Sequence, residues 1–186
     1  MKMYPLRRSQ RSNSGFTLIE ALVVIIMAGV LSAIAAPGWL TFMNRQRVNA
    51  AQDQALQSLR LAQAKAMREN RDWEASFRED NGVVQWSVHD MSEGTVIWQN
   101  LTEDPDRIKI DADTSNLNVG CDEGDYCAQF DDRGSLKDDN GNFPYNDSVI
   151  GQITFTTSDV DNGPKRCAIV ATLLGSLQTG KDENCG

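Results

Sequence analysis

The chain has 186 residues, 26 of them acidic and 18 basic, and a formal net charge of −8. This length allows one domain with its own hydrophobic core beside a membrane segment. The acidity is concentrated in residues 99–186, which hold 17 acidic and 7 basic residues. A negative surface repels nucleic-acid phosphates, so general nucleic-acid binding is not expected there.

The N-terminus joins a basic leader to an apolar segment. Residues 1–15 contain no acid and four basic residues, Lys2, Arg7, Arg8 and Arg11. The 21 residues Phe16–Ala36 are apolar or small, apart from two hydroxyl residues and Glu20. About 20 apolar residues span a bilayer as a helix. The leader should stay in the cytoplasm, and the chain after the apolar segment should lie on the opposite side of the membrane.

Glu20 decides how this segment is interpreted. A carboxylate in a membrane helix costs several kcal/mol and is usually functional or paired. An ordinary secretory signal is the alternative, cut at a small-x-small site near Ala33–Ala36, but it gives Glu20 no role. A second alternative places Glu20 in the lipid headgroup zone near the helix start.

The hexapeptide Gly15–Glu20, GFTLIE, resembles the processing and methylation signature of type IV prepilins and type II secretion pseudopilins. The resemblance implies that prepilin peptidase cuts between Gly15 and Phe16 and methylates the new amino group of Phe16. It also implies that Glu20 meets the N-terminal amine of a neighbouring subunit and sets the register of assembly. Such a protein is a filament subunit and not an enzyme.

Pro37 follows the apolar segment. Proline removes a helical hydrogen bond, so it kinks or ends a helix. The resemblance implies a filament-assembly role for Pro37, because many type IV pilins carry a proline there and their helix loosens near it; the alternative is that it ends the membrane segment. Trp39 fits an anchor at the membrane interface.

A second helical stretch covers residues 39–70. Its apolar positions recur with a spacing of three or four residues and are mostly small: Val48, Ala51, Ala55, Leu59, Ala62 and Ala66. Joined to the apolar segment, this predicts a helix over about 16–70, roughly 80 Å long at about 1.5 Å per residue. The small stripe should pack closely on a sheet.

Beyond residue 70 the apolar period changes to two. Trp73, Ala75 and Phe77 alternate with polar residues, and Asp80-Asn81-Gly82 predicts a hairpin. Further strands are predicted at 95–99, 107–111, 128–130, 149–156, 166–173 and 176–179. Three tryptophans, Trp73, Trp86 and Trp98, are predicted in the core. The expected fold is α+β, a long helix packed on an antiparallel sheet or sandwich.

The strand pattern also resembles the pseudopilin H and FimT-like branch, whose members are minor components. The resemblance rests on residues 130–134 and on a Cys-Ala-Ile-Val strand that runs into Leu174-Gly175. Several FimT-like minor pilins bind DNA through a Gly-Arg-x-Arg arrangement. Here the corresponding stretch is GSLQ from Gly175, without either arginine, and only Lys181 follows. Nucleic acid is therefore not an expected partner.

Four cysteines, Cys121, Cys127, Cys167 and Cys185, lie in the exported half, which favours disulfides. Three pairings are possible, and Cys121–Cys127 with Cys167–Cys185 is preferred because each closes a local loop. No cofactor is expected. The acidic stretch 131–142 forms a solvated turn, or else holds calcium. The calcium candidates are Asp138, Asp139, Asn140 and Asn142. The single histidine, His89, is expected to be structural, and zinc is not expected.

These observations predict four regions. Residues 1–15 are a leader that is removed, 16–38 the membrane and assembly helix, 39–70 its amphipathic continuation, and 71–186 an extracytoplasmic β domain. The predicted function is a minor pilin or pseudopilin, held in the inner membrane by one span before it enters a filament. The predicted partners are prepilin peptidase, other pilins or pseudopilins, an inner-membrane assembly platform and membrane lipid. The alternative function is a binding module at the filament tip, an adhesin or a DNA receptor.

Overall fold

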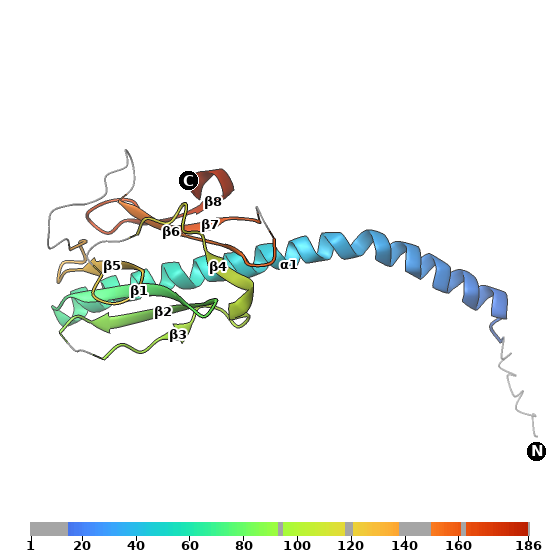
Figure 1. Cartoon of the computed structure of the whole chain (residues 1–186), viewed down its shortest axis with the longest axis horizontal. Helices are drawn as coiled ribbons and strands as arrows, with labels where there is room; N and C mark the ends of the chain where they lie inside the picture. The colour runs from blue at the N-terminus through green and yellow to red at the C-terminus, as the bar shows by residue number, and fades with distance from the viewer. Residues whose placement is uncertain (1–14, 93–94, 118–120, 138–149, 161–162, 186) are drawn as a thin grey trace, which may run out of the picture. The chain divides into compact units, whose positions relative to one another are not determined.

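The computed structural model describes residues 15–92, 95–117, 121–137, 150–160 and 163–185. The chain divides into an N-terminal unit that ends at Leu40 and a compact unit that begins at Thr41 (Figure 1). Helix α1, Leu18–Glu69, contributes to both units. The helix begins two residues later and ends one residue earlier than the predicted range of about 16–70.

In the compact unit, α1 buries one narrow face. The six predicted stripe residues, Val48, Ala51, Ala55, Leu59, Ala62 and Ala66, are all fully buried. Alanine at four of these positions keeps the helix surface low, so strands can approach closely. Helical periodicity therefore predicted the buried face correctly, residue by residue.

The first sheet has the strand order β3-β2-β1-β5 and is antiparallel. Its strands are β1 (Trp73–Asp80), β2 (Val83–Asp90), β3 (Gln99–Asn100) and β5 (Tyr126–Phe130). The hairpin between β1 and β2 turns at Asn81 and Gly82, with φ of 52° and 77°. Positive φ at both central residues is what a two-residue hairpin turn requires, which explains the Asn-Gly sequence.

The second sheet has the order β4-β6-β7-β8 and is also antiparallel. Its strands are β4 (Ile108–Ile110), β6 (Gly151–Thr157), β7 (Arg166–Val170) and β8 (Leu177–Lys181). Two short 3₁₀ turns, Pro105–Arg107 and Asp182–Cys185, precede β4 and follow β8. The α+β prediction, a long helix on antiparallel β structure, is confirmed.

One core joins the helix to both sheets. The α1 stripe packs with Phe77 and Phe130 of the first sheet and with Ile153 and Phe155 of the second. Figure 1 shows the C-terminal half of α1 running beside both groups of strands. Since neither sheet is covered without the helix, the compact unit is a single folding unit.

Two glutamines of α1 add polar contacts around this core. The Nε2 atom of Gln52 donates to the carbonyl oxygens of Cys167 and Gly180, each at 2.7 Å. Three turns later, Gln63 donates to the carbonyls of Gly134 at 2.8 Å and Gly175 at 3.1 Å. Gln52 thus ties α1 to β7 and β8 of the second sheet. Gln63 ties the same helix to the loops at Gly134 and Gly175.

The structure corrects three strand-level predictions. Residues 95–98 form no regular strand, and the pairing is limited to Gln99–Asn100. The last strand is shifted to Leu177–Lys181, and β7 ends at Val170 instead of residue 173. Trp98 is not in the core. It lies under the guanidinium of Arg78, 4.2 Å from the ring centroid, on the outer face of the first sheet.

Candidate assembly site and buried polar sites

The helix start is built from the motif residues. Thr17 precedes α1, and its Oγ1 accepts a hydrogen bond from the Glu20 backbone N–H at 3.3 Å. Glu20 is the third helical residue, so Thr17-Leu18-Ile19-Glu20 has the spacing of a capping box. The helix N-terminus favours a carboxylate there. The motif therefore also has a local structural role, as the N-terminal cap of α1.

The peptide bond between Gly15 and Phe16 lies just before this cap. Residues 15–17 have no regular secondary structure, and the Phe16 side chain is 77% exposed. A peptidase binds extended chain in its cleft, so a bond outside the helix is accessible to it. After cleavage at this bond, the new amino group would belong to Phe16, next to the capping residue.

The N-terminal unit presents large apolar side chains to its surroundings. The described part of this unit exposes Phe16, Leu18, Ile19, Leu22, Val23, Val24, Ile25, Ile26, Met27, Val30, Leu31, Ile34, Trp39 and Leu40. By length and composition the helix can cross a membrane, with a mean hydropathy of 2.6 in its most apolar window. Ser32 donates its hydroxyl to the Ala28 carbonyl at 2.7 Å, which satisfies a polar group within the apolar surface.

Pro37 lies inside α1 rather than at its end. The helix continues past it to Glu69, so Pro37 does not interrupt α1, and the alternative that it ends the membrane segment stays a prediction. Because proline has no N–H, the carbonyl of Ala33 loses its usual donor four residues later. This missing bond is a weak point in an otherwise continuous ladder.

Residues 10–36 match the family profile described as the prokaryotic N-terminal methylation motif. The match covers the end of the basic leader and the first part of the apolar helix, which α1 continues into the compact unit with its two antiparallel sheets.

None of the curated proteins matches the chain in sequence. Two solved structures are similar to it. The minor pseudopilin EpsH from the type 2 secretion system of Vibrio cholerae is 10% identical, with a TM-score of 0.46 over 72% of this chain and 95% of that one. The type IV minor pilin FimU of Pseudomonas aeruginosa is 16% identical, with a TM-score of 0.45 over 78% and 99%.

A buried carboxylate lies on the outer face of the first sheet. Glu74 is fully buried, although it occupies a position of β1 that alternation predicts to be exposed. Its oxygens accept hydrogen bonds from Gln129 Nε2 at 2.8 Å and from the backbone N–H groups of Asp122 at 3.1 Å and Glu123 at 3.4 Å. The Ser76 hydroxyl also donates to it. These donors offset the cost of burying the carboxylate.

The loop that covers Glu74 is held by a disulfide. Cys121 is joined to Cys127, which is the first of the two local pairings preferred from the sequence. His89 of β2 is 5% exposed, with its Nε2 atom 3.8 Å from Glu74 Oε1. The histidine is thus packed beside the acid, in line with the structural role expected for it.

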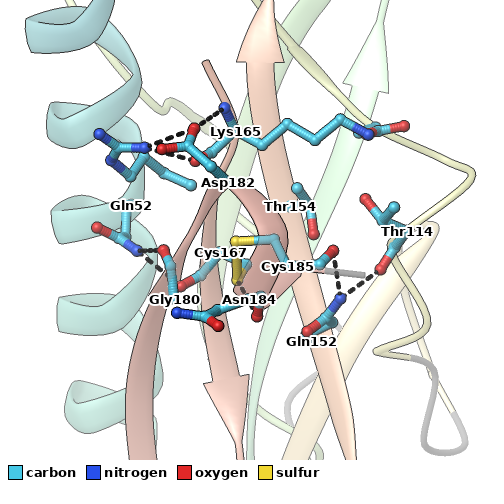
Figure 2. Close-up of a disulfide and its surroundings, with 12 residues drawn as sticks. Gln52, Thr114, Gln152, Thr154, Lys165, Cys167, Gly180, Asp182, Asn184 and Cys185 are labelled. Carbon is cyan, nitrogen blue, oxygen red and sulfur yellow. Dashed lines mark hydrogen bonds and ion pairs between the residues drawn. A yellow bond between two sulfur atoms is a disulfide. The ribbon is translucent and has the colours of Figure 1, made fainter. Parts of the chain in front are cut away.

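The second disulfide fixes the C-terminus. Cys167 of β7 is joined to Cys185 of the final 3₁₀ turn, and Figure 2 shows this bridge between two glutamine contacts. Gln52 holds the Cys167 carbonyl from the helix side, and Gln152 Nε2 donates to the carbonyls of Cys185 and Thr114, each at 2.8 Å. A side chain at Gly180 would collide with the Cys167 sulfur and the Asn184 carbonyl.

The calcium candidates Asp138, Asp139, Asn140 and Asn142 lie outside the described residues. Within the described part of the chain, no group of three histidine, cysteine, aspartate or glutamate side chains is arranged to hold a metal ion. Sequence reasoning missed Glu74, Gln52 and Gln63. Apart from Ser76, the hydrogen-bond partners named above for these three residues are 48 to 128 residues away, so no local pattern signalled them.

Proposed function

We propose that the chain is a minor pilin or a pseudopilin, assembled into a filament through its N-terminal helix. The observation that carries this proposal is the exposed bond between Gly15 and Phe16, immediately before a capped apolar helix that carries Glu20. Prepilin peptidase would cut this bond and methylate Phe16. The leader would face the cytoplasm, and the β domain would lie outside the inner membrane.

Assembly would then exchange lipid for protein around the helix. In the membrane, the exposed apolar side chains of residues 16–40 contact acyl chains. In the filament, they pack against the helices of other pilins or pseudopilins after an inner-membrane platform extracts the subunit. The carboxylate of Glu20 would pair with the methylated amine of a neighbour, since an unpaired charge is costly in an apolar bundle. The missing hydrogen bond at Pro37 would let the helix loosen there.

The first experiment measures the intact mass of the protein in cells with and without prepilin peptidase. We expect the mature chain to begin at Phe16 and to carry one added methyl group only when the peptidase is present. A mature chain that begins near residue 37 would instead support an ordinary secretory signal and contradict the proposal. The variant Gly15→Arg, which changes only the leader residue at the cut, should accumulate uncut.

The second experiment counts surface filaments by electron microscopy after deletion of the gene. Loss of filaments, restored by the wild-type gene and poorly by Glu20→Gln, would place the chain in pilus assembly. Glu20→Gln keeps the size of the side chain and removes only its charge. Unchanged filaments would direct the test to secreted proteins, as expected for a pseudopilin. If filaments and secretion are both unaffected, the proposed function fails.

The alternative of a tip-located adhesin or DNA receptor is not favoured, because the stretch that follows Gly175 lacks both arginines of the Gly-Arg-x-Arg arrangement. The cations near the final strand are in part neutralised, since Lys165 is paired with Asp111 and Arg166 contacts Asp182. We therefore keep the structural subunit as the proposed function.

A further inference from the structure

A cationic groove lies at the start of the compact unit. It is formed by Asn44 and Arg45 of α1, by Arg166 at the beginning of β7, and by Lys181 at the end of β8. These residues carry three positive charges. The acid beside them is Asp182, whose Oδ1 atom lies 3.1 Å from Arg166 Nη1. The groove therefore keeps a positive excess in a chain whose net charge is −8.

The cations are held together by the fold. Arg166 and Lys181 are directly opposite each other in the antiparallel pair of β7 and β8, so their side chains project from the same face. Arg166 Nε donates to Asn49 Oδ1 at 2.8 Å, and Asn49 lies one helical turn after Arg45. Like charges at directly opposed positions destabilise a sheet. Asp182, which is paired with Arg166, offsets part of this repulsion, and a bound anion would offset the rest.

Two of the three cations remain available to a ligand. Arg45 and Lys181 are exposed, and neither side chain forms an ion pair or hydrogen bond in the part of the chain that the structure describes. Asp182 faces Arg166, and Lys165 beside it is already bound to Asp111. An anion that enters the groove would thus meet two unpaired cations, Arg45 and Lys181. It would also meet the guanidinium of Arg166, which is already paired with Asp182.

Arg45 of the groove is close in sequence to the apolar segment. Arg45 comes nine residues after Ala36, the last residue of the apolar segment, and nine helical residues span about 14 Å. Residues 37–52 include two arginines and no acid. Basic residues within this reach of a bilayer are attracted to anionic headgroups.

We propose that the groove binds the phosphate of an anionic phospholipid headgroup while the chain is anchored in the membrane. This inference rests on the membrane anchoring in the proposed function. The bound headgroup would orient the β domain on the membrane before assembly. Extraction of the subunit would release the lipid and expose the cations to the filament.

The test uses the full chain, purified in a neutral detergent and titrated with phosphatidylglycerol or phosphatidylcholine. Native mass spectrometry measures how many lipids stay bound. We expect the wild type to retain phosphatidylglycerol preferentially, and the double variant Arg45→Gln/Lys181→Gln to bind it roughly tenfold more weakly. The matched control, Arg60→Gln/Arg133→Gln, removes two exposed cations elsewhere and should keep the preference.

Three results would overturn the proposal. One is a wild type with no preference for the anionic lipid. Another is an equal loss in both double variants, which would show a nonspecific charge effect. The third is carbodiimide cross-linking of Lys181 to a carboxylate of a second copy, unaffected by added phosphatidylglycerol, which would assign the groove to an acidic protein surface instead. Membrane fractionation of both variants separates this test from the proposed function, because anchoring depends on the apolar helix and should not change.

Discussion

At the scale of single residues, the chain holds its carboxylates in three different environments. Glu20 is exposed at a helix N-terminus, where the Thr17 cap lies beside it. Glu74 is fully buried and satisfied by four donors. Asp90 is 4% exposed at the junction of helix and sheet. The exposed position of Glu20 is compatible with the assembly role proposed for it, whereas Glu74 attaches a loop and Asp90 contributes to stability.

Asp90 makes stability depend on pH. Hydrogen bonds from the hydroxyl and then the backbone N–H of Ser92, with a further contribution from Arg71, lower the pKa of Asp90 to about 2 against the opposing effect of burial. A lowered pKa in the folded state stabilises the protein above the ordinary value of 3.8, and this stabilisation disappears as the pH falls towards 2. It amounts to about 2 kcal/mol.

We therefore expect Asp90→Asn to lower the free energy of unfolding by about 2 kcal/mol at pH 7, with the difference shrinking between about pH 4 and pH 2. Denaturant titrations of both proteins across this range measure it. The control is Asp53→Asn, which removes an exposed carboxylate of α1 and should change little. A difference that does not vary with pH would contradict the assignment.

At the scale of elements, α1 combines two unlike surfaces in one helix. Its first part exposes large apolar side chains, whereas its last part buries small ones. The alanines of the stripe bring the backbone close to the strands, so there is no spare volume along that face. The strands then meet the helix through larger side chains such as Phe77 and Phe155.

Adding volume to this face should destabilise the compact unit. Ala62 is fully buried, so we expect Ala62→Leu to lower the free energy of unfolding by about 1–3 kcal/mol through overpacking. Gln57→Leu, on the exposed face of the same helix, is the control, since leucine is a good helix former at both positions. Equal stability of the two variants would show that the stripe tolerates larger side chains.

At the scale of the whole molecule, the two disulfides act on different parts of the compact unit. Cys121–Cys127 closes a short loop over Glu74, and Cys167–Cys185 ties the C-terminal turn to the central strands of the second sheet. The glutamine contacts from Gln52 and Gln152 converge on this second bridge (Figure 2). The bridge therefore joins α1, the sheet and the chain end.

Removing the second disulfide should lower the stability of the whole compact unit. The bridge spans 18 residues, and we expect Cys167→Ser/Cys185→Ser to lower the free energy of unfolding by about 3 kcal/mol. Denaturant titration of the oxidised proteins measures this loss. Adding reductant to the double variant reports on the remaining bridge alone. An unchanged unfolding free energy would show that the hydrogen bonds around Cys185 hold the chain end without the disulfide.

The sequence by itself determined the parts of this protein that depend on neighbours along the chain. The leader, the apolar span, the methylation motif, the buried stripe of α1 and the Asn81-Gly82 turn each follow from a local pattern of charge, period or φ preference. The tertiary structure alone decided the burial of Glu74, the place of Trp98 on the outer face of the first sheet, and the meeting of Arg45 with Arg166 and Lys181. The physical reason is distance in sequence. These residues are positioned by partners far along the chain, and packing against such partners overrides what the local alternation of apolar and polar residues predicts.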